Sequence, residues 1–164
     1  MDTIAKFAFP GVILLLGMVG GILTSKAIPT WYNNLKKPKL NPPNWVFGPV
    51  WTVLYLMIGY SGYLIWNQNK EFSENHSLAW RVYFLQLGLN YMWTPIFFGF
   101  KKLLLSVIII FGMAFSIVLN VLMFYSIQPI AGLMLIPYFL WVSYASYLNF
   151  SIWKLNNSDS IKDN

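Results

Sequence analysis

Long apolar runs separated by short polar or charged stretches dominate the chain. Nineteen uncharged residues lie between Lys6 and Lys26, and fifty-one lie between Lys102 and Lys154. About twenty apolar residues cross a bilayer core as a helix. The longest run therefore holds two crossings, with a turn near 126–129 where polar residues and a proline interrupt it. The pattern predicts an all-α integral membrane protein, a bundle of five transmembrane helices at about 7–27, 46–66, 81–100, 103–127 and 130–153.

The composition agrees with a single membrane domain. Of 164 residues, 57% are hydrophobic and 10% are charged, against about 25% charged in soluble domains. No polar stretch is long enough to link two folded units, so residues 1–155 are predicted to form one domain, with a polar tail at 156–164. The first apolar run lacks an A-x-A-like cleavage site, so we interpret it as a permanent helix and not as a signal peptide.

The basic residues predict the orientation in the membrane. Three Lys or Arg side chains lie in the N-terminus and the second and fourth loops, and eight lie in the first loop, the third loop and the tail. Because cytoplasmic loops carry the excess of Lys and Arg, the first loop and the C-terminus are expected to be cytoplasmic, with the N-terminus on the opposite side. We interpret the net charge of +6 as the result of basic residues that set the orientation in the membrane and contact anionic lipid. Nucleic acid is not predicted as a partner, because the basic residues are scattered at helix ends.

Several classes of chemistry are absent from the sequence. There are no cysteines, and the one histidine, His76, is flanked by Asn and Ser in a polar loop. All five acidic residues lie outside the predicted spans, which disfavours a proton-coupled pump or an ion channel. No Walker A motif, dinucleotide loop, catalytic triad or carboxylate pair is present. We therefore predict no metal site and no required cofactor.

Amides and aromatic rings recur at helical spacing inside three of the predicted spans. At 1.5 Å rise per residue, these faces converge in the half of the bundle beneath the first loop, which predicts a pocket open or gated toward the cytoplasm. The faces comprise Gln86, Asn90, Trp93, Thr94 and Phe97; Trp141, Ala145, Leu148, Asn149 and Ile152; and Trp51, Tyr55, Ile58 and Gly62.

Purely structural interpretations stand beside this one. Tryptophans near helix ends commonly form an interfacial belt, and we assign Trp66, Trp80 and Trp153 to such a belt. For the deeper Trp51, Trp93 and Trp141, helix packing and ligand contact are equally supported by spacing. Periodicity alone favours Asn90, Asn149 and Gln86 as hydrogen-bonding groups between helices. The G-x-x-x-G pair of Gly17 and Gly21 fits close packing within the monomer as well as a dimer interface.

The stretch 31–55 is stiff, aromatic and basic. It carries four prolines, three lysines and three tryptophans, and each proline fixes its φ angle and restricts the residue before it. A stiff aromatic and basic lid suits a flat, partly anionic apolar molecule. The residues assigned to this lid are Trp31, Pro42, Pro43 and Trp45.

Three motifs in order resemble the TspO/MBR family, the translocator or tryptophan-rich sensory proteins, also called peripheral benzodiazepine receptors. The resemblance covers essentially the whole chain. The motifs are Trp31-Tyr32, Lys37-Pro38, Pro42-Pro43, Trp45 and Pro49-Val50-Trp51-Thr52; Gln86-Leu87, Leu89-Asn90 and Trp93-Thr94-Pro95; and Pro137-Tyr138, Trp141, Ala145 and Leu148-Asn149.

The resemblance implies a five-helix fold, often a homodimer, with a ligand pocket beneath the first loop. It implies tetrapyrroles such as protoporphyrin and haem, sterols such as cholesterol, and synthetic drugs as ligands. Trp51 and Trp141 match the tryptophans implicated in porphyrin binding and breakdown, and Asn90 matches an amide that faces the ligand. The other matched pocket residues are Tyr32, Trp93, Ala145 and Leu148.

The functional hypothesis is a membrane sensor or translocator that binds tetrapyrroles, with Lys36, Lys37 and Lys39 as candidate partners of the propionates. The alternatives are a porphyrin-degrading enzyme that acts by photo-oxidation through Trp51 and Trp141, or sterol or lipid binding and transport. Binding without catalysis is favoured over enzymatic activity. The family's sterol consensus fails by one position between Tyr147 and Lys154, and the acidic residue that many members carry near the start of the fourth helix is missing. The expected location is the cell membrane of a prokaryote or the mitochondrial outer membrane of a eukaryote.

Overall fold

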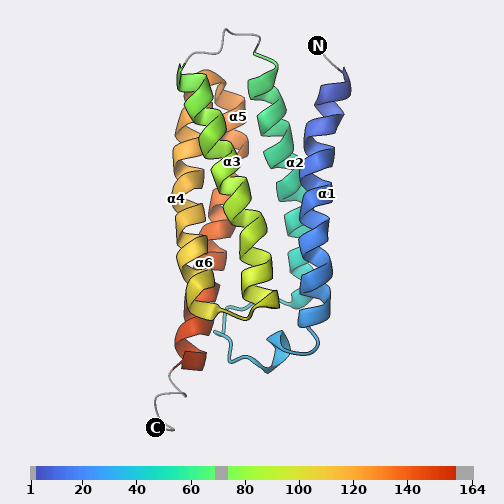
Figure 1. The fold of residues 1–164 in the computed structure, drawn as a ribbon, viewed down its shortest axis with the longest axis vertical. Coiled ribbons are helices and arrows are strands. Elements are labelled where there is room, and N and C mark those ends of the chain that lie inside the picture. Colours follow the sequence, from blue (N-terminus) through green and yellow to red (C-terminus); the bar gives the residue numbers. More distant parts are fainter. Residues whose placement is uncertain (1–2, 69–73, 158–164) are drawn as a thin grey trace.

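Five long helices and a short sixth one run side by side in the computed structural model, which describes residues 3–68 and 74–157 (Figure 1). The α-helices are α1 (Thr3–Ala27), α2 (Phe47–Trp66), α3 (Glu74–Thr94), α4 (Leu103–Ile127), α5 (Pro129–Met134) and α6 (Ile136–Asn157). Two 3₁₀ turns, η1 (Tyr32–Asn34) and η2 (Asn44–Val46), lie in the α1–α2 loop, and a π-turn, η3 (Pro95–Gly99), follows α3. No strand occurs in the described part, so the predicted all-α class is confirmed.

Four segments within the described residues are long and apolar enough to cross a bilayer, namely Thr3–Ala27, Asn44–Trp66, Leu103–Ile127 and Pro129–Asn157. The helix α3 is not among them, because Glu74, Arg81, Gln86 and Asn90 lower its hydropathy. It lies beside the others in the bundle (Figure 1). A fifth crossing, and with it the five-helix membrane bundle, stays a prediction.

Three predicted helices have different bounds in the structure. The first begins at Thr3 and not near 7. The third begins at Glu74 and not near 81, since a helix can continue past the apolar part of its sequence. Its α-helical part ends at Thr94 instead of near 100 because Pro95 has no N–H, and the chain continues as a π-turn in which Phe100 N–H donates to Pro95 O at 2.8 Å.

The predicted fifth helix is divided into α5 and α6, with Leu135 between them. Pro137 lacks the N–H that would continue the helical ladder here. The predicted turn at 126–129 is confirmed: Gln128 leaves the helix with φ −146°, and its side-chain oxygen accepts the Ile130 N–H at 3.2 Å, which caps α5.

The first loop lies at one end of the bundle, together with the α3–α4 turn and the end of α6 (Figure 1). We call this the loop end, and we call the end with Thr3, Trp66 and Glu74 the opposite end. Two contacts with α6 hold the loop. The Asn156 side chain donates to Lys36 O at 3.0 Å and accepts the Lys36 N–H at 3.1 Å, and the Tyr144 hydroxyl donates to Leu40 O.

Candidate ligand-binding cavity

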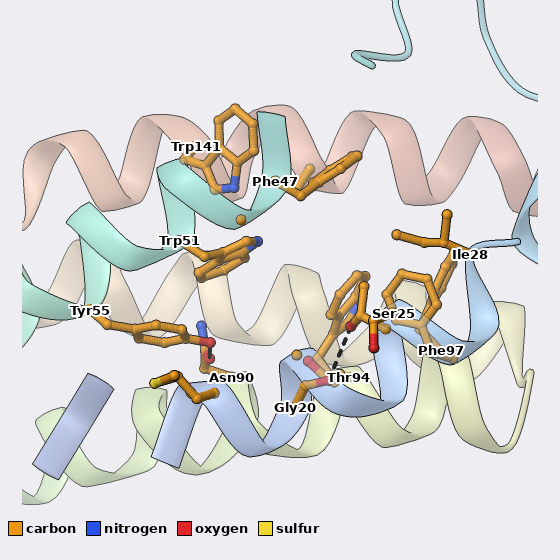
Figure 2. Close-up of a pocket in the computed structure, with 18 of the residues that line it drawn as sticks. Gly20, Ser25, Ile28, Phe47, Trp51, Tyr55, Asn90, Thr94, Phe97 and Trp141 are labelled. Atoms are coloured by element: carbon orange, nitrogen blue, oxygen red, sulfur yellow. Dashed lines mark hydrogen bonds between the residues drawn. The ribbon is translucent and has the colours of Figure 1, made fainter. Parts of the chain in front are cut away.

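A cavity of about 480 Å³ lies in the loop-end half of the bundle (Figure 2). Its volume lies within the roughly 300–1,000 Å³ that is usual for small-molecule sites. Side chains from α1, α2, α3, η3, α4, α6 and the first loop form its wall. All seven residues predicted to contact a ligand lie on this wall: Tyr32, Trp51, Asn90, Trp93, Trp141, Ala145 and Leu148. Their contact with a ligand stays a prediction.

Trp51 and Trp141 form aromatic walls on α2 and α6 (Figure 2). Trp51 stacks on Tyr55 with ring centroids 5.3 Å apart. Trp141 meets Phe47 edge to face at 6.1 Å, and its indole nitrogen is buried without a hydrogen-bond partner among the described residues. The cavity therefore has flat apolar faces, and the Trp141 nitrogen is buried behind one of them.

Trp93 is fixed from two sides. Its ring stacks on Phe97 at 5.0 Å with an interplanar angle of 14°, and its indole N–H donates to Asn149 Oδ1 at 2.8 Å. Asn149 in turn donates to Ser106 Oγ at 3.0 Å, which links α3 through α6 to α4. This ring is therefore a rigid part of the wall.

Asn90 connects three helices at the inner end of the cavity. The Tyr55 hydroxyl donates to Asn90 Oδ1 at 3.0 Å, and Asn90 Nδ2 donates to the Tyr138 hydroxyl at 2.9 Å, which donates to Met113 Sδ at 3.4 Å. The interpretation of Asn90 and Asn149 as hydrogen-bonding groups between helices is confirmed. Both residues also line the cavity, so the two interpretations are compatible. Gln86, predicted on the same face as Asn90, is fully buried away from the cavity wall. Its side-chain amide has no hydrogen-bond partner among the described residues, so the interpretation as a hydrogen-bonding group is wrong for Gln86.

Among the residues that the structure describes, no charged side chain lines the cavity. Of the three loop lysines, Lys37 is held by its own loop. Its Nζ donates to Asn33 O at 3.1 Å and Leu35 O at 3.2 Å and lies 4.7 Å from the Tyr32 ring centre. Burial lowers the pKa of Lys37. A ligand inside the cavity thus meets a neutral wall, and none of the three loop lysines belongs to it.

The first loop contributes Ile28, Tyr32 and Asn44 to the wall, but none of the four predicted lid residues. Tyr32 is buried, which raises its pKa to about 12, so its hydroxyl stays protonated and donates to Asn41 Oδ1 at 2.9 Å. Trp31 packs edge to face on Phe97 at 5.5 Å. Pro42 and Pro43 are partly or fully exposed, and Trp45 is 74% exposed. The lid role of these residues stays a prediction.

The contribution of α1 was missed by the sequence reasoning. This helix supplies a large part of the wall: Leu14, Gly17, Met18, Gly20, Gly21, Ile22, Thr24 and Ser25. The only signal was the G-x-x-x-G pair. Gly17 does lie tightly against the Tyr55 ring within the monomer, whereas a Cβ at Gly21 would meet no atom within 4 Å.

The described residues contain no group of three or more His, Asp or Glu side chains suited to a metal.

An all-helical bundle with membrane-length apolar helices defines an integral membrane protein, and its deep cavity has the size usual for small-molecule sites. Residues 9–154 match the TspO/MBR family, and the chain belongs to that family. It is 38% identical over 144 residues to a tryptophan-rich protein TspO of Archaeoglobus fulgidus, which covers 88% of this chain and 92% of the relative. It is 36% identical over 130 residues to the human translocator protein, covering 77% of this chain and 75% of the relative. A tryptophan-rich sensory protein of Cereibacter sphaeroides is 33% identical over 126 residues, 77% of either chain.

Proposed function

We propose that this protein binds a tetrapyrrole, such as protoporphyrin or haem, in the loop-end cavity and acts as a membrane sensor or translocator. The observation that carries the proposal is the neutral cavity of about 480 Å³ walled by Trp51, Trp93 and Trp141. Broad aromatic faces suit a flat macrocycle through stacking and dispersion. The names of relatives, translocator protein and tryptophan-rich sensory protein, support the membrane role.

The ligand's polar groups fit this arrangement only in one orientation. Burying a propionate in a cavity without a cation costs several kcal/mol or more. The carboxylates are therefore expected at the loop end of the cavity, toward the first loop that carries Lys36 and Lys39, neither of which lines the wall. The macrocycle fills the space among the tryptophans.

The proposed setting is a five-helix membrane bundle with α3 as the fifth crossing. The first loop and the C-terminus face the cytoplasm, as the excess of Lys and Arg at that end indicates. The membrane is the cell membrane of a prokaryote or the mitochondrial outer membrane of a eukaryote. Homodimer formation, implied by the family, is part of the same proposal.

Tryptophan fluorescence tests the binding. Protoporphyrin titrated into purified protein should quench the fluorescence saturably, and the double variant Trp51→Phe, Trp141→Phe should bind at least about tenfold more weakly, a change of about 1.4 kcal/mol. Trp66→Phe with Trp153→Phe is the matched control, because neither residue lines the cavity. Absence of saturable quenching, or an equal loss in the control, would contradict the proposal.

A second candidate is photo-oxidative breakdown of the porphyrin. It is favoured by the oxidisable rings next to the cavity, since Trp51 stacks on Tyr55 at 5.3 Å and Tyr55 stacks on Tyr91 at 6.3 Å. Illumination of the bound porphyrin should then bleach it faster than free porphyrin, and Trp51→Phe should slow the bleaching. Sterol or lipid transport, the remaining alternative, predicts that cholesterol displaces protoporphyrin in the same titration.

A further inference from the structure

We propose that the cavity is entered from the bilayer, through a gap between the loop-end halves of α1 and α2. Its ligand is then a molecule already dissolved in the membrane and not one taken up from water. This inference rests on the proposed function, because it names the route and the kind of ligand for the same cavity.

Toward the opposite end, the seam between α1 and α2 is closed. Gly59 of α2 lies directly against the backbone of Pro10, and Gly17 of α1 lies directly against the ring of Tyr55. A single Cβ at either glycine would overlap these atoms. No ligand passes through this part of the seam without separating the helices.

Toward the loop end, the same two helices leave open space. A Cβ at Gly20 would find Thr94 of α3 as its nearest neighbour, at 3.3 Å, so α1 here leans on α3. A Cβ at Gly21 of α1 or at Gly48 of α2 would meet no atom within 4 Å. Both glycines belong to the cavity wall, so the open space on the two helices is continuous with the cavity.

The wall residues next to this gap are also exposed on the outside of the bundle. Met18 and Ile22 of α1 are 59% and 57% exposed, and Thr52 of α2 is exposed as well, although all three line the cavity. Residues with both properties mark an opening. In Figure 2, the pocket lies between α2, which carries Trp51, and α1, which carries Gly20 and Ser25.

The chemistry of the gap suits lipid contact. The hydroxyls of Thr52 and Ser25 donate to carbonyls of their own helices, Gly48 O and Ile22 O, each at 2.9 Å. Their polar atoms are thus satisfied within the helix, and the edges of the gap present mainly carbon to the bilayer. A buried polar group without such a partner would be costly there.

In contrast to the gap between α1 and α2, the route through the first loop is blocked. Trp31 and Tyr32 pack on Phe97 with ring centroids 5.5 and 6.2 Å apart. The Asn156 side chain holds the Lys36 backbone by two hydrogen bonds. A ligand arriving from water must break these contacts, whereas one arriving from the bilayer finds the space already open.

Cysteine labelling tests the route without any tetrapyrrole. The chain has no native cysteine, so Ala145→Cys places a single thiol on the cavity wall. In protein reconstituted into vesicles, N-(1-pyrenyl)maleimide, which dissolves in the bilayer, should label this thiol at least tenfold faster than a sulfonated, membrane-impermeant maleimide at equal concentration. Adding Gly21→Phe or Gly48→Phe should fill the gap and slow the pyrene label at least tenfold.

Gly112→Phe is the matched control. Gly112 is an exposed helical glycine of α4 whose Cβ would also meet no atom within 4 Å, and it does not line the cavity. It should leave labelling unchanged. Equal slowing by Gly112→Phe, or no slowing by Gly21→Phe and Gly48→Phe in protein with an unchanged melting temperature, overturns the proposal. If a phenylalanine variant does not fold, Gly21→Leu is used under the same criteria.

If the sulfonated maleimide labels the thiol faster than the pyrene maleimide, the proposal is overturned as well. If Asn156→Leu then speeds labelling by the sulfonated maleimide, the first loop is the entrance.

Stopped-flow quenching by protoporphyrin separates the two proposals. If protoporphyrin does not bind, the proposed function fails while the labelling still decides the route. If it binds and exchanges at unchanged rates in Gly21→Phe and Gly48→Phe, the route fails while the function stands.

Discussion

The two ends of the bundle use the same kinds of residue for opposite results. At the opposite end, aromatic rings pack on one another: Tyr83 stacks on Phe124 at 5.4 Å, and Trp80 meets Tyr83 edge to face at 5.3 Å. At the loop end, Trp51 and Trp141 surround a void of about 480 Å³. Aromatic content alone therefore does not mark a binding site; the neighbours of each ring decide it.

The glycines differ in the same way. Gly59 is needed because the Pro10 backbone occupies the place of a side chain, while Gly48 on the same helix faces open space. One glycine permits close helix packing, and the other borders an opening. The loop-end helices, which cannot pack across a void, are joined instead by the hydrogen bonds of Asn90 and Asn149.

The largest difference in stability is expected between two single variants, Gly59→Ala and Gly48→Ala. Gly59→Ala should destabilise the protein by about 1–3 kcal/mol, because its methyl group overpacks the α1–α2 contact. Gly48→Ala should be neutral or stabilising by up to about 1 kcal/mol, since alanine is the better helix former. Thermal unfolding in detergent, followed by circular dichroism, measures both. Equal effects of the two substitutions would remove the distinction between the closed and the open parts of the seam.

A smaller effect is expected from the polar network. Asn90→Leu leaves the Tyr55 and Tyr138 hydroxyls without their amide partner and should cost about 1–2 kcal/mol, near the upper values for hydrogen bonds between membrane helices. Tyr83→Phe removes one hydroxyl, which donates to Ile58 O at 3.1 Å, from an end held mainly by ring packing. It should cost about 0.5 kcal/mol. A larger loss for Tyr83→Phe in the same unfolding assay would reverse our assignment of what holds each end.

The smallest effect on stability is expected at the first loop. Asn156→Leu removes two exposed hydrogen bonds to Lys36. It should change the free energy of unfolding by less than about 0.5 kcal/mol, because water replaces exposed bonds. Hydrogen exchange at residues 32–41 should nevertheless become faster, because the loop loses its contact with the end of α6. Exchange within α4 serves as the internal control. Unchanged exchange in the loop would show that Tyr144 and the ring contacts hold it alone.

The fold class and the wall contributed by α3 and α6 could be predicted from the sequence because both follow from periodicity. The 3.6-residue repeat placed Trp141, Ala145, Leu148, Asn149 and Ile152 on one face, and all five line the cavity. The same repeat failed for Ile58 and Gly62, which continue the face of Trp51 but lie beyond the inner end of the cavity. Helical spacing fixes the direction of a side chain and not the depth at which a void ends.

The wall from α1 could not be predicted, because nothing in that helix differs chemically from a lipid-facing segment. Its glycines acquire different roles only when a partner is near: Tyr55 beside Gly17, Thr94 near Gly20, and no atom within 4 Å of a Cβ at Gly21. The hydrogen-bond partners of the intramembrane amides likewise could not be predicted from the sequence. The amides were visible as unusual intramembrane groups, but their bonding to Tyr138 and Trp93 depends on helix contacts.

The sequence by itself thus determined an all-helical membrane chain, its family, and the aromatic faces of α2, α3 and α6, since apolar length, charge spacing and periodicity are local properties. The tertiary structure alone decided where α1 and α2 separate. It also decided that the charged residues of the described ranges stay off the cavity wall and that the first loop is held to α6 by Asn156 and Tyr144. These features arise from distances between segments far apart in the chain, which local pattern does not encode.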